Sequence, residues 1–242
     1  MREVGYGVLN PKMETFMKKI AVLLSGCGVY DGTEIQEAVS VLIALDELGA
    51  AAVCVAPDMP QHHVVDHLTG DDMGHARNVR VESARIARGA VLDLAEVKVA
   101  ELDGLVIPGG FGAAKNLSNW AFAGPDCTVQ PGVAALIQDM VAAGKPVAAL
   151  CVAPVLLAKA LSGMGITLTL GTPEGASPYD IEGFHAGVAS LGAKPVACEL
   201  GEIAVDAAHK VVTTPCYMMD AGPAAILAGV RKACAQLLAW TA

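Results

Sequence analysis

Cys151 is the residue of this sequence whose surroundings most favour nucleophilic chemistry. It follows the apolar run VAAL and precedes VAPVLLAKAL, a stretch typical of a helix with proline in its first turn. The pattern predicts a tight turn between a buried strand and a helix. Peptide dipoles and free N–H groups at a helix start favour a thiolate, so we expect the pKa of Cys151 to lie below its ordinary value of about 8.5.

Two backbone segments and a glutamate extend this candidate site. Gly109 and Gly110 follow another predicted strand, and glycines there let backbone N–H groups approach a substrate oxygen. With the N–H of Val152 they would form an oxyanion hole. Glu34 opens the first predicted helix and would act as a general acid and base, with a pKa raised by burial.

Each of these features also has a simpler interpretation. A free cysteine is often a small buried hydrophobe, and two glycines after a strand often make a tight turn. A glutamate in a first helical turn can complement the helix dipole. The chemistry therefore depends on whether the fold brings these residues together.

The order of the predicted elements places them at one edge of a sheet. An apolar run beginning at Lys19 predicts a strand, 34–48 a helix and 51–57 a second strand, which together make a parallel βαβ unit. The segments 104–120 and 147–161 each begin as a strand that ends at a candidate site residue. Ligands of parallel α/β folds bind at the carboxyl ends of the strands.

The sequence predicts one domain with a short N-terminal extension. Residues 1–18 show no clear periodicity and are interpreted as a loosely held, poorly ordered N-terminal extension. Residues 19–242 show no repeat, low-complexity tract or linker, so we expect a single α/β domain, for which 242 residues is a suitable length. The polar part, 58–100, should form short helices and a small hairpin.

Composition excludes several classes of function. A net charge of −9 argues against nucleic acid and anionic membrane partners. The longest apolar stretch, 146–158, is shorter than the roughly 20 residues that span a bilayer. The N-terminus lacks the apolar core of a secretory signal, and seven cysteines at scattered spacings suggest no disulfide framework. We therefore expect a soluble protein of the reducing cytoplasm.

Other reactive side chains have ordinary alternatives. Cys27, in the loop after the first strand, would be either a second active-site thiol or a small side chain in a turn flanked by glycines. His62, His63, His67 and His75 lack the carboxylate or cysteine pattern of a metal site, so no metal is expected.

Four segments carry a resemblance to a known family. SGCGVYDGTEIQEAV, VIPGGFGAAKNLS, ALCVAP and KVVTTPCYM together resemble the ElbB branch of the ThiJ/PfpI superfamily, glyoxalase-like proteins also called enhancing-lycopene-biosynthesis or sigma cross-reacting proteins. The likeness runs in the same order from about Lys18 to the C-terminus. It implies a class I glutamine amidotransferase-like fold: a flavodoxin-like three-layer sandwich, with a mostly parallel sheet, helices on both faces and a cysteine on a nucleophile elbow.

The resemblance also implies roles for residues. Cys151 falls on the elbow, Glu34 on the glutamate that hydrogen-bonds the cysteine, and Gly109 and Gly110 on the oxyanion loop. A homodimer, a cytoplasmic location and no required cofactor are implied as well. Many relatives carry a histidine directly after the nucleophile or on a following strand; here Val152 and the segment TLGTPEG stand in those places.

No amidotransferase or protease triad can therefore be assembled. His185 and His209 remain as candidates only by elimination. The expected activity is that of a glutathione-independent glyoxalase, a lyase that converts glyoxal or methylglyoxal to a 2-hydroxy acid through a cysteine hemithioacetal. The alternative is an oxidative-stress sensor or regulatory binding protein, whose thiolate is oxidised to a sulfinate.

Overall fold

The structure is a computed structural model in which residues 17–241 are described. Most of the extension predicted for residues 1–18 lies outside this range. Lys18 belongs to the folded part, because its Nζ donates to the carbonyl of Thr241 at 2.6 Å and lies 3.8 Å from the Asp103 carboxylate.

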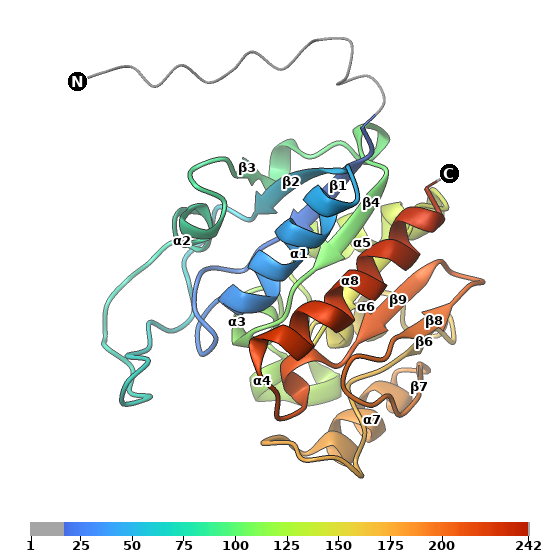
Figure 1. Ribbon diagram of the computed structural model, residues 1–242. Helices are drawn as coiled ribbons and strands as arrows, with labels where there is room; N and C mark the ends of the chain where they lie inside the picture. The colour runs from blue at the N-terminus through green and yellow to red at the C-terminus, as the bar shows by residue number, and fades with distance from the viewer. Residues whose placement is uncertain (1–16, 242) are drawn as a thin grey trace.

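A seven-stranded sheet forms the middle of the molecule (Figure 1). The strand order is β3-β2-β1-β4-β5-β9-β8, and neighbouring strands are parallel except for β8, which is antiparallel to β9. The strands of this sheet are β1 (Lys19–Leu23), β2 (Ala51–Ala56), β3 (Leu92–Asp93), β4 (Gly104–Ile107), β5 (Val147–Leu150), β8 (Ala204–Asp206) and β9 (Val211–Thr214). A separate parallel pair is formed by β6 (Thr167–Leu168) and β7 (Lys194–Pro195).

Helices cover both faces of the sheet. In Figure 1, α1 and α8 lie side by side on one face, and α5 and α6 lie against the other. The α-helices are α1 (Ile35–Glu47), α2 (Val79–Ile86), α3 (Phe111–Lys115), α4 (Trp120–Ala123), α5 (Pro131–Ala142), α6 (Pro154–Ala160), α7 (Ile181–Ser190) and α8 (Pro223–Ala239). Four short 3₁₀ helices occupy Leu94–Glu96, Val99–Glu101, Gly124–Asp126 and Cys216–Met218. The predicted flavodoxin-like α/β fold is confirmed.

The sequence forms these elements for simple reasons. All residues of β4, β5 and β9 are buried, as expected for central parallel strands covered on both faces, and their sequences GLVI, VAAL and VVTT contain no charged residue. Proline occupies the first turn of α5, α6 and α8, where its missing N–H removes no helical hydrogen bond.

The polar segment 58–100 differs from the expectation in one respect. A short hairpin closed by the bridge Val65↔Asp72 and the helix α2 agree with it. The segment also adds β3 to the sheet edge, where Val55 pairs with Leu92. Two paired residues leave no periodic pattern, so this edge strand could not be predicted.

Truncating the central strand tests the role of the core. Leu105 in β4 is fully buried, so Leu105→Ala should lower the free energy of unfolding by about 2–5 kcal/mol, because it removes apolar contact and leaves a cavity. Val205→Ala in β8, where the side chain is 42% exposed, is the control and should change it by about 1 kcal/mol or less. Urea denaturation of both variants measures the difference, and equal losses would contradict this account of the core.

Candidate active site

Cys151 lies on a strained turn between β5 and α6. Its φ is +57°, a left-handed conformation that is unfavourable for a residue with a Cβ. Its N–H donates to the Thr214 carbonyl at 3.0 Å, so the turn stays attached to β9. The side chain is almost completely buried, with 6% of the residue exposed. The structure thus places Cys151 on an elbow at the carboxyl edge of the sheet, as the sequence predicted.

The carboxyl group beside this thiol belongs to Glu37. Glu37 is fully buried in the first turn of α1, and its carboxyl group lies beside the Cys151 thiol: a Cβ on Gly109 would lie 2.7 Å from Glu37 Oε2 and 3.0 Å from Cys151 Sγ. Its Oε2 accepts the N–H of Gly109 at 2.8 Å, and its Oε1 accepts the N–H of Tyr217 at 3.2 Å. Two backbone donors from different loops therefore fix the carboxyl group against the sulfur.

This arrangement corrects the contact expected for Glu34. Glu34 is the N-cap of α1, and its Oε2 accepts the N–H of Glu37 at 2.6 Å, so that oxygen is engaged in capping the helix. One turn later Glu37 faces the sheet edge. The missed signal is periodicity: Glu37 occupies the buried stripe that continues at Val41 and Ala44, where a carboxylate is unusual.

The oxyanion donors differ in part from the expectation. The N–H groups of Gly110 and Val152 both act to lower the pKa of the Cys151 thiol, and each would face an oxygen bonded to the carbon that the sulfur attacks. The N–H of Gly109 is occupied by Glu37 and is not free for a substrate. Gly110 adopts φ +96°, which a residue with a side chain rarely does.

Burial and mutual repulsion set the protonation of the pair. Burial, followed by the Glu34 charge, raises the pKa of Glu37 to about 8. Burial, followed by the Glu37 charge, raises the pKa of the Cys151 thiol, although the N–H groups of Gly110 and Val152 oppose this. The lowered thiol pKa expected from the sequence is therefore wrong for the free protein, because desolvation outweighs the helix start.

A small pocket opens at the thiol. Its walls are mostly apolar and aromatic, and burial raises the pKa of the Tyr179 hydroxyl in this wall to about 12. The lining residues are Val29, Glu34, Gly110, Phe111, Cys151, Val152, Tyr179, Phe184, Tyr217 and Met218. Glu34 thus borders the pocket, although it does not hold the thiol.

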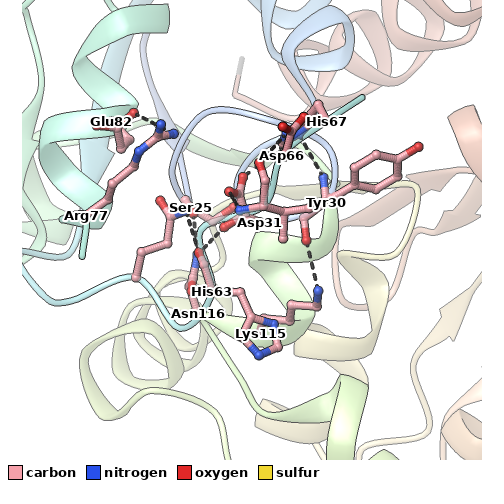
Figure 2. Close-up of polar contacts among 12 residues, drawn as sticks. Ser25, Tyr30, Asp31, His63, Asp66, His67, Arg77, Glu82, Lys115 and Asn116 are labelled. Carbon is pink, nitrogen blue, oxygen red and sulfur yellow. Dashed lines mark hydrogen bonds and ion pairs between the residues drawn. The ribbon is translucent and has the colours of Figure 1, made fainter. Parts of the chain in front are cut away.

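The loop between β1 and α1 is locked to the loop after β4. Phe111 N–H donates to the Val29 carbonyl at 2.8 Å, and Glu34 N–H donates to the Gly109 carbonyl at 2.9 Å. Figure 2 shows side chains that form hydrogen bonds with the loop between β1 and α1. Asn116 Nδ2 donates to the carbonyls of Ser25 and Asp31, both at 2.8 Å.

Two further side chains in Figure 2 hold the same loop. Lys115 Nζ donates to the Tyr30 carbonyl at 3.0 Å. His67, from the hairpin, accepts the Tyr30 N–H with Nε2 at 3.3 Å, and its Nδ1 lies 3.0 Å from the Val65 carbonyl. His67 thus has a structural role in this loop.

The remaining histidines also lie away from the thiol. His62 and His63 pack against Phe122, and His209 bonds Asp206 at 2.9 Å. Burial lowers the pKa of His185, whose Nε2 is buried without a partner. No histidine lines the Cys151 pocket.

The second thiol near the site is Cys216 and not Cys27. Burial raises the pKa of Cys27, and the charges that act most strongly on it are those of Glu82 and Arg85. Cys27 does not line the pocket. Cys216 follows β9 at the same edge as Cys151, is 2% exposed and has φ +46°. Burial and then the Glu37 charge raise its pKa, with a further contribution from Cys151. The Gly-flanked turn is thus the better interpretation of Cys27.

Two further properties concern residues 17–241. Within this range, no group of three or more His, Cys, Asp or Glu side chains is arranged to hold a metal ion. No helix of the described chain has both the length and the apolar character needed to cross a membrane.

The fold and the strained cysteine define a class: flavodoxin-like α/β proteins with a cysteine on a strand-to-helix elbow. Residues 18–172 match the model of the DJ-1/PfpI family. The chain is 48% identical, over 84% of its length and 75% of the relative, to human glutamine amidotransferase-like class 1 domain-containing protein 3, mitochondrial. It is 32% identical to the zebrafish (Danio rerio) ES1 protein, mitochondrial, over 83% and 77%. This chain belongs to the DJ-1/PfpI family.

Solved structures agree with this assignment. An isoprenoid biosynthesis protein with an amidotransferase-like domain from Ehrlichia chaffeensis superposes with a TM-score of 0.83 at 33% identity, covering 92% of this chain and 99% of the other. Drosophila melanogaster DJ-1beta shares the fold, with a TM-score of 0.55 at 18% identity, over 92% and 91%. The expected cytoplasmic location is contradicted, because the curated relatives are named as mitochondrial proteins.

A methyl group at position 109 tests the contact between the elbow and the carboxyl group. A Cβ on Gly109 would lie 2.4 Å from Cys151 Cβ and 2.7 Å from Glu37 Oε2. Gly109→Ala should therefore lower the free energy of unfolding by about 1–3 kcal/mol in urea denaturation. Gly222→Ala, with nothing within 4 Å of the added Cβ and φ −88°, meets no clash and should cost about 1 kcal/mol or less, because it only replaces the N-cap of α8 with a poorer one. Equal effects would contradict the close approach.

The raised pKa of Glu37 predicts a pH-dependent stability. Between its ordinary value of 4.5 and about 8, the folded protein holds a proton that the unfolded chain has released. Stability contributed by this proton is complete at low pH and is lost as pH rises from 4.5 towards 8, by at most about 1.4 kcal/mol per pH unit.

Glu37→Gln should remove this slope, because glutamine does not titrate. The exposed Glu101→Gln is the matched control and should retain the wild-type slope. Urea denaturation at several pH values between 5 and 8 measures the slopes. Parallel slopes for wild type and Glu37→Gln would show that Glu37 is not the titrating group.

Proposed function

We propose that the protein is a cofactor-independent glyoxalase acting on small 2-oxoaldehydes such as glyoxal or methylglyoxal. The observation that carries the proposal is the buried pair of Cys151 and Glu37, whose side chains lie beside each other at the base of a small apolar pocket. Such a pair can add a thiol to an aldehyde and then move a proton, the two operations that the reaction needs.

The reaction begins with addition to the aldehyde. The ionised form of Glu37 takes the thiol proton as the sulfur of Cys151 bonds to the aldehyde carbon and the carbonyl π bond breaks. The new oxyanion is stabilised by the N–H groups of Gly110 and Val152, which favour the thiolate in the free protein. Glu37 then gives its proton to this oxygen, which yields the hemithioacetal and returns Glu37 to its carboxylate form.

The second stage moves hydrogen between adjacent carbons. Glu37 removes the proton from the hemithioacetal carbon, an enediol-like intermediate forms, and the proton returns to the neighbouring carbon. The resulting thioester is hydrolysed by water, which releases a 2-hydroxy acid and the thiol. One aldehyde and one water give one hydroxy acid, so no redox cofactor is consumed. A pKa of about 8 suits Glu37 to giving and taking a proton near neutral pH.

Several features support this function over its rivals. No histidine lines the pocket, which argues against a hydrolase or amidotransferase triad. The oxidative-sensor alternative requires an accessible thiolate, whereas Cys151 is 6% exposed and burial raises its pKa.

The finer family assignment and the assembly state are part of the proposal. The four sequence segments favour the ElbB branch within the family. The homodimer implied by that branch is supported by a stripe of partly exposed apolar side chains on α1, at Ile35, Val39 and Ile43.

Conversion of glyoxal and methylglyoxal to glycolate and lactate, without glutathione or cofactor, tests the function. Wild type should turn over, Cys151→Ala should be inactive, and Glu37→Gln should be slower by about 10²–10⁴-fold. Glu34→Gln should lose less than Glu37→Gln, because Glu34 borders the pocket without touching the sulfur.

The matched cysteine control is Cys27→Ser, which should retain wild-type activity because Cys27 lies outside the pocket. Full hydroxy-acid production by Cys151→Ala would overturn the mechanism. Absence of turnover by the wild-type protein would overturn the function.

A further inference from the structure

Three further hollows lie near the Cys151 pocket, and two of them share lining residues with it. The hollow next to the pocket shares Val29, Glu34, Tyr179 and Tyr217 with it. A further hollow shares Asp220 with this one, and another meets the pocket at Tyr179. A substrate whose carbonyl reaches Cys151 would extend through this shared opening.

The charged side chains that line these four hollows are all acidic. Among residues 17–241, no lysine, arginine or histidine lines them. The acidic residues are Glu34, Glu174, Asp180, Glu182, Glu199 and Asp220. A concave site lined by one sign of charge concentrates ligands of the opposite sign and repels those of the same sign.

Lys115, a cationic residue near these hollows, already has a hydrogen-bond partner. Lys115 Nζ donates to the Tyr30 carbonyl at 3.0 Å and stands 5.2 Å from the centre of the Phe111 ring, and Lys115 does not line the pocket. Burial lowers its pKa. It therefore offers an anionic substrate no free positive partner in the opening.

Aromatic rings connect the apolar base to the acidic rim. Tyr179 and Tyr217 line both the pocket and the hollow next to it. Aromatic faces attract cations as well as apolar groups. A small carbonyl compound with a positive group at its far end would thus meet apolar walls near the thiol, then the tyrosines, and then the carboxylates.

We propose that this site selects carbonyl compounds that carry a protonated amine and rejects anionic ones, with Glu34 and Asp220 as specificity-determining residues. The carbonyl part of this inference rests on the proposed function. The covalent step is an addition: the S–C bond forms, the carbonyl π bond breaks and the thiol proton ends on the former carbonyl oxygen. Nothing is oxidised or reduced.

Charged thiol reagents test the selection without requiring turnover. Methanethiosulfonates with a trimethylammonium-ethyl, a methyl or a sulfonatoethyl group each transfer their alkylthio group to a thiol and release methanesulfinate. The rate of labelling is measured at Cys151 by peptide mass spectrometry, in the wild-type protein and against N-acetylcysteine amide as the free thiol.

The cationic reagent should label Cys151 at least about tenfold faster than the anionic one, relative to the ratio for the free thiol, and high salt should reduce this preference. Asp220→Asn and Glu34→Gln should each lower the ratio by about threefold. Glu101→Gln, which removes an exposed carboxylate before β4 at the opposite edge of the sheet, should leave it unchanged.

A ratio equal to that of the free thiol, faster labelling by the anionic reagent, failure of the cationic reagent to label Cys151, or an Asp220→Asn variant with the wild-type ratio would each overturn the inference. The outcome is separable from the proposed function. Charge-selective labelling without aldehyde turnover would refute only the glyoxalase, and turnover without charge selection would refute only this inference.

Discussion

The burial of the Glu37 carboxyl group beside the Cys151 thiol is the constraint on which the rest of the site depends. Two acidic groups buried together cannot both be ionised at low cost, so at least one of them keeps its proton near neutral pH. The N–H groups of Gly109 and Tyr217 stabilise the carboxylate form of Glu37, and those of Gly110 and Val152 stabilise the thiolate form of Cys151. Backbone donors are therefore in place whichever of the two groups, Glu37 or Cys151, loses its proton.

This contact requires elements that are distant in sequence to meet within a few ångströms. Glu37 comes from α1, the glycines from the loop after β4, and Tyr217 from the turn after β9. Parallel strands make the meeting possible because their carboxyl ends lie at one edge. The close approach leaves no room for side chains: a Cβ on Gly112 would lie 2.4 Å from Ser25 Oγ. Glycine is therefore needed where the loops cross.

The electrostatics of the site follow from the same burial. Desolvation raises the pKa values of the thiol and of its carboxyl partner, and the Tyr179 hydroxyl above them is shifted in the same direction. Within the described chain no basic side chain lines the pocket, and burial favours the protonated form of its nucleophile. Proton transfer to Glu37 and attack on the carbonyl then belong to one step, which suits an electrophilic aldehyde better than an amide.

The sequence by itself determined the parallel α/β fold, the elbow at Cys151 and the glycine loop. Each depends on a local sequence pattern. An apolar strand segment is followed by Cys151 in one case, and by Gly109 and Gly110 in the other. The tertiary structure decided which carboxyl group touches the thiol. Glu34 and Glu37 are three residues apart, and only the rotation of α1 against the sheet places Glu37 inside.

Other properties of the site were also decided only by the fold. The edge strand β3 and the position of Cys216 depend on pairing between distant segments. The predicted direction of the Cys151 pKa shift was wrong, because the sequence shows the helix start that lowers the pKa but not the depth of burial that raises it. Burial is a property of the whole fold. Periodicity fixes which residues can face inward; packing of the elements fixes what they meet there, and the chemistry depends on that meeting.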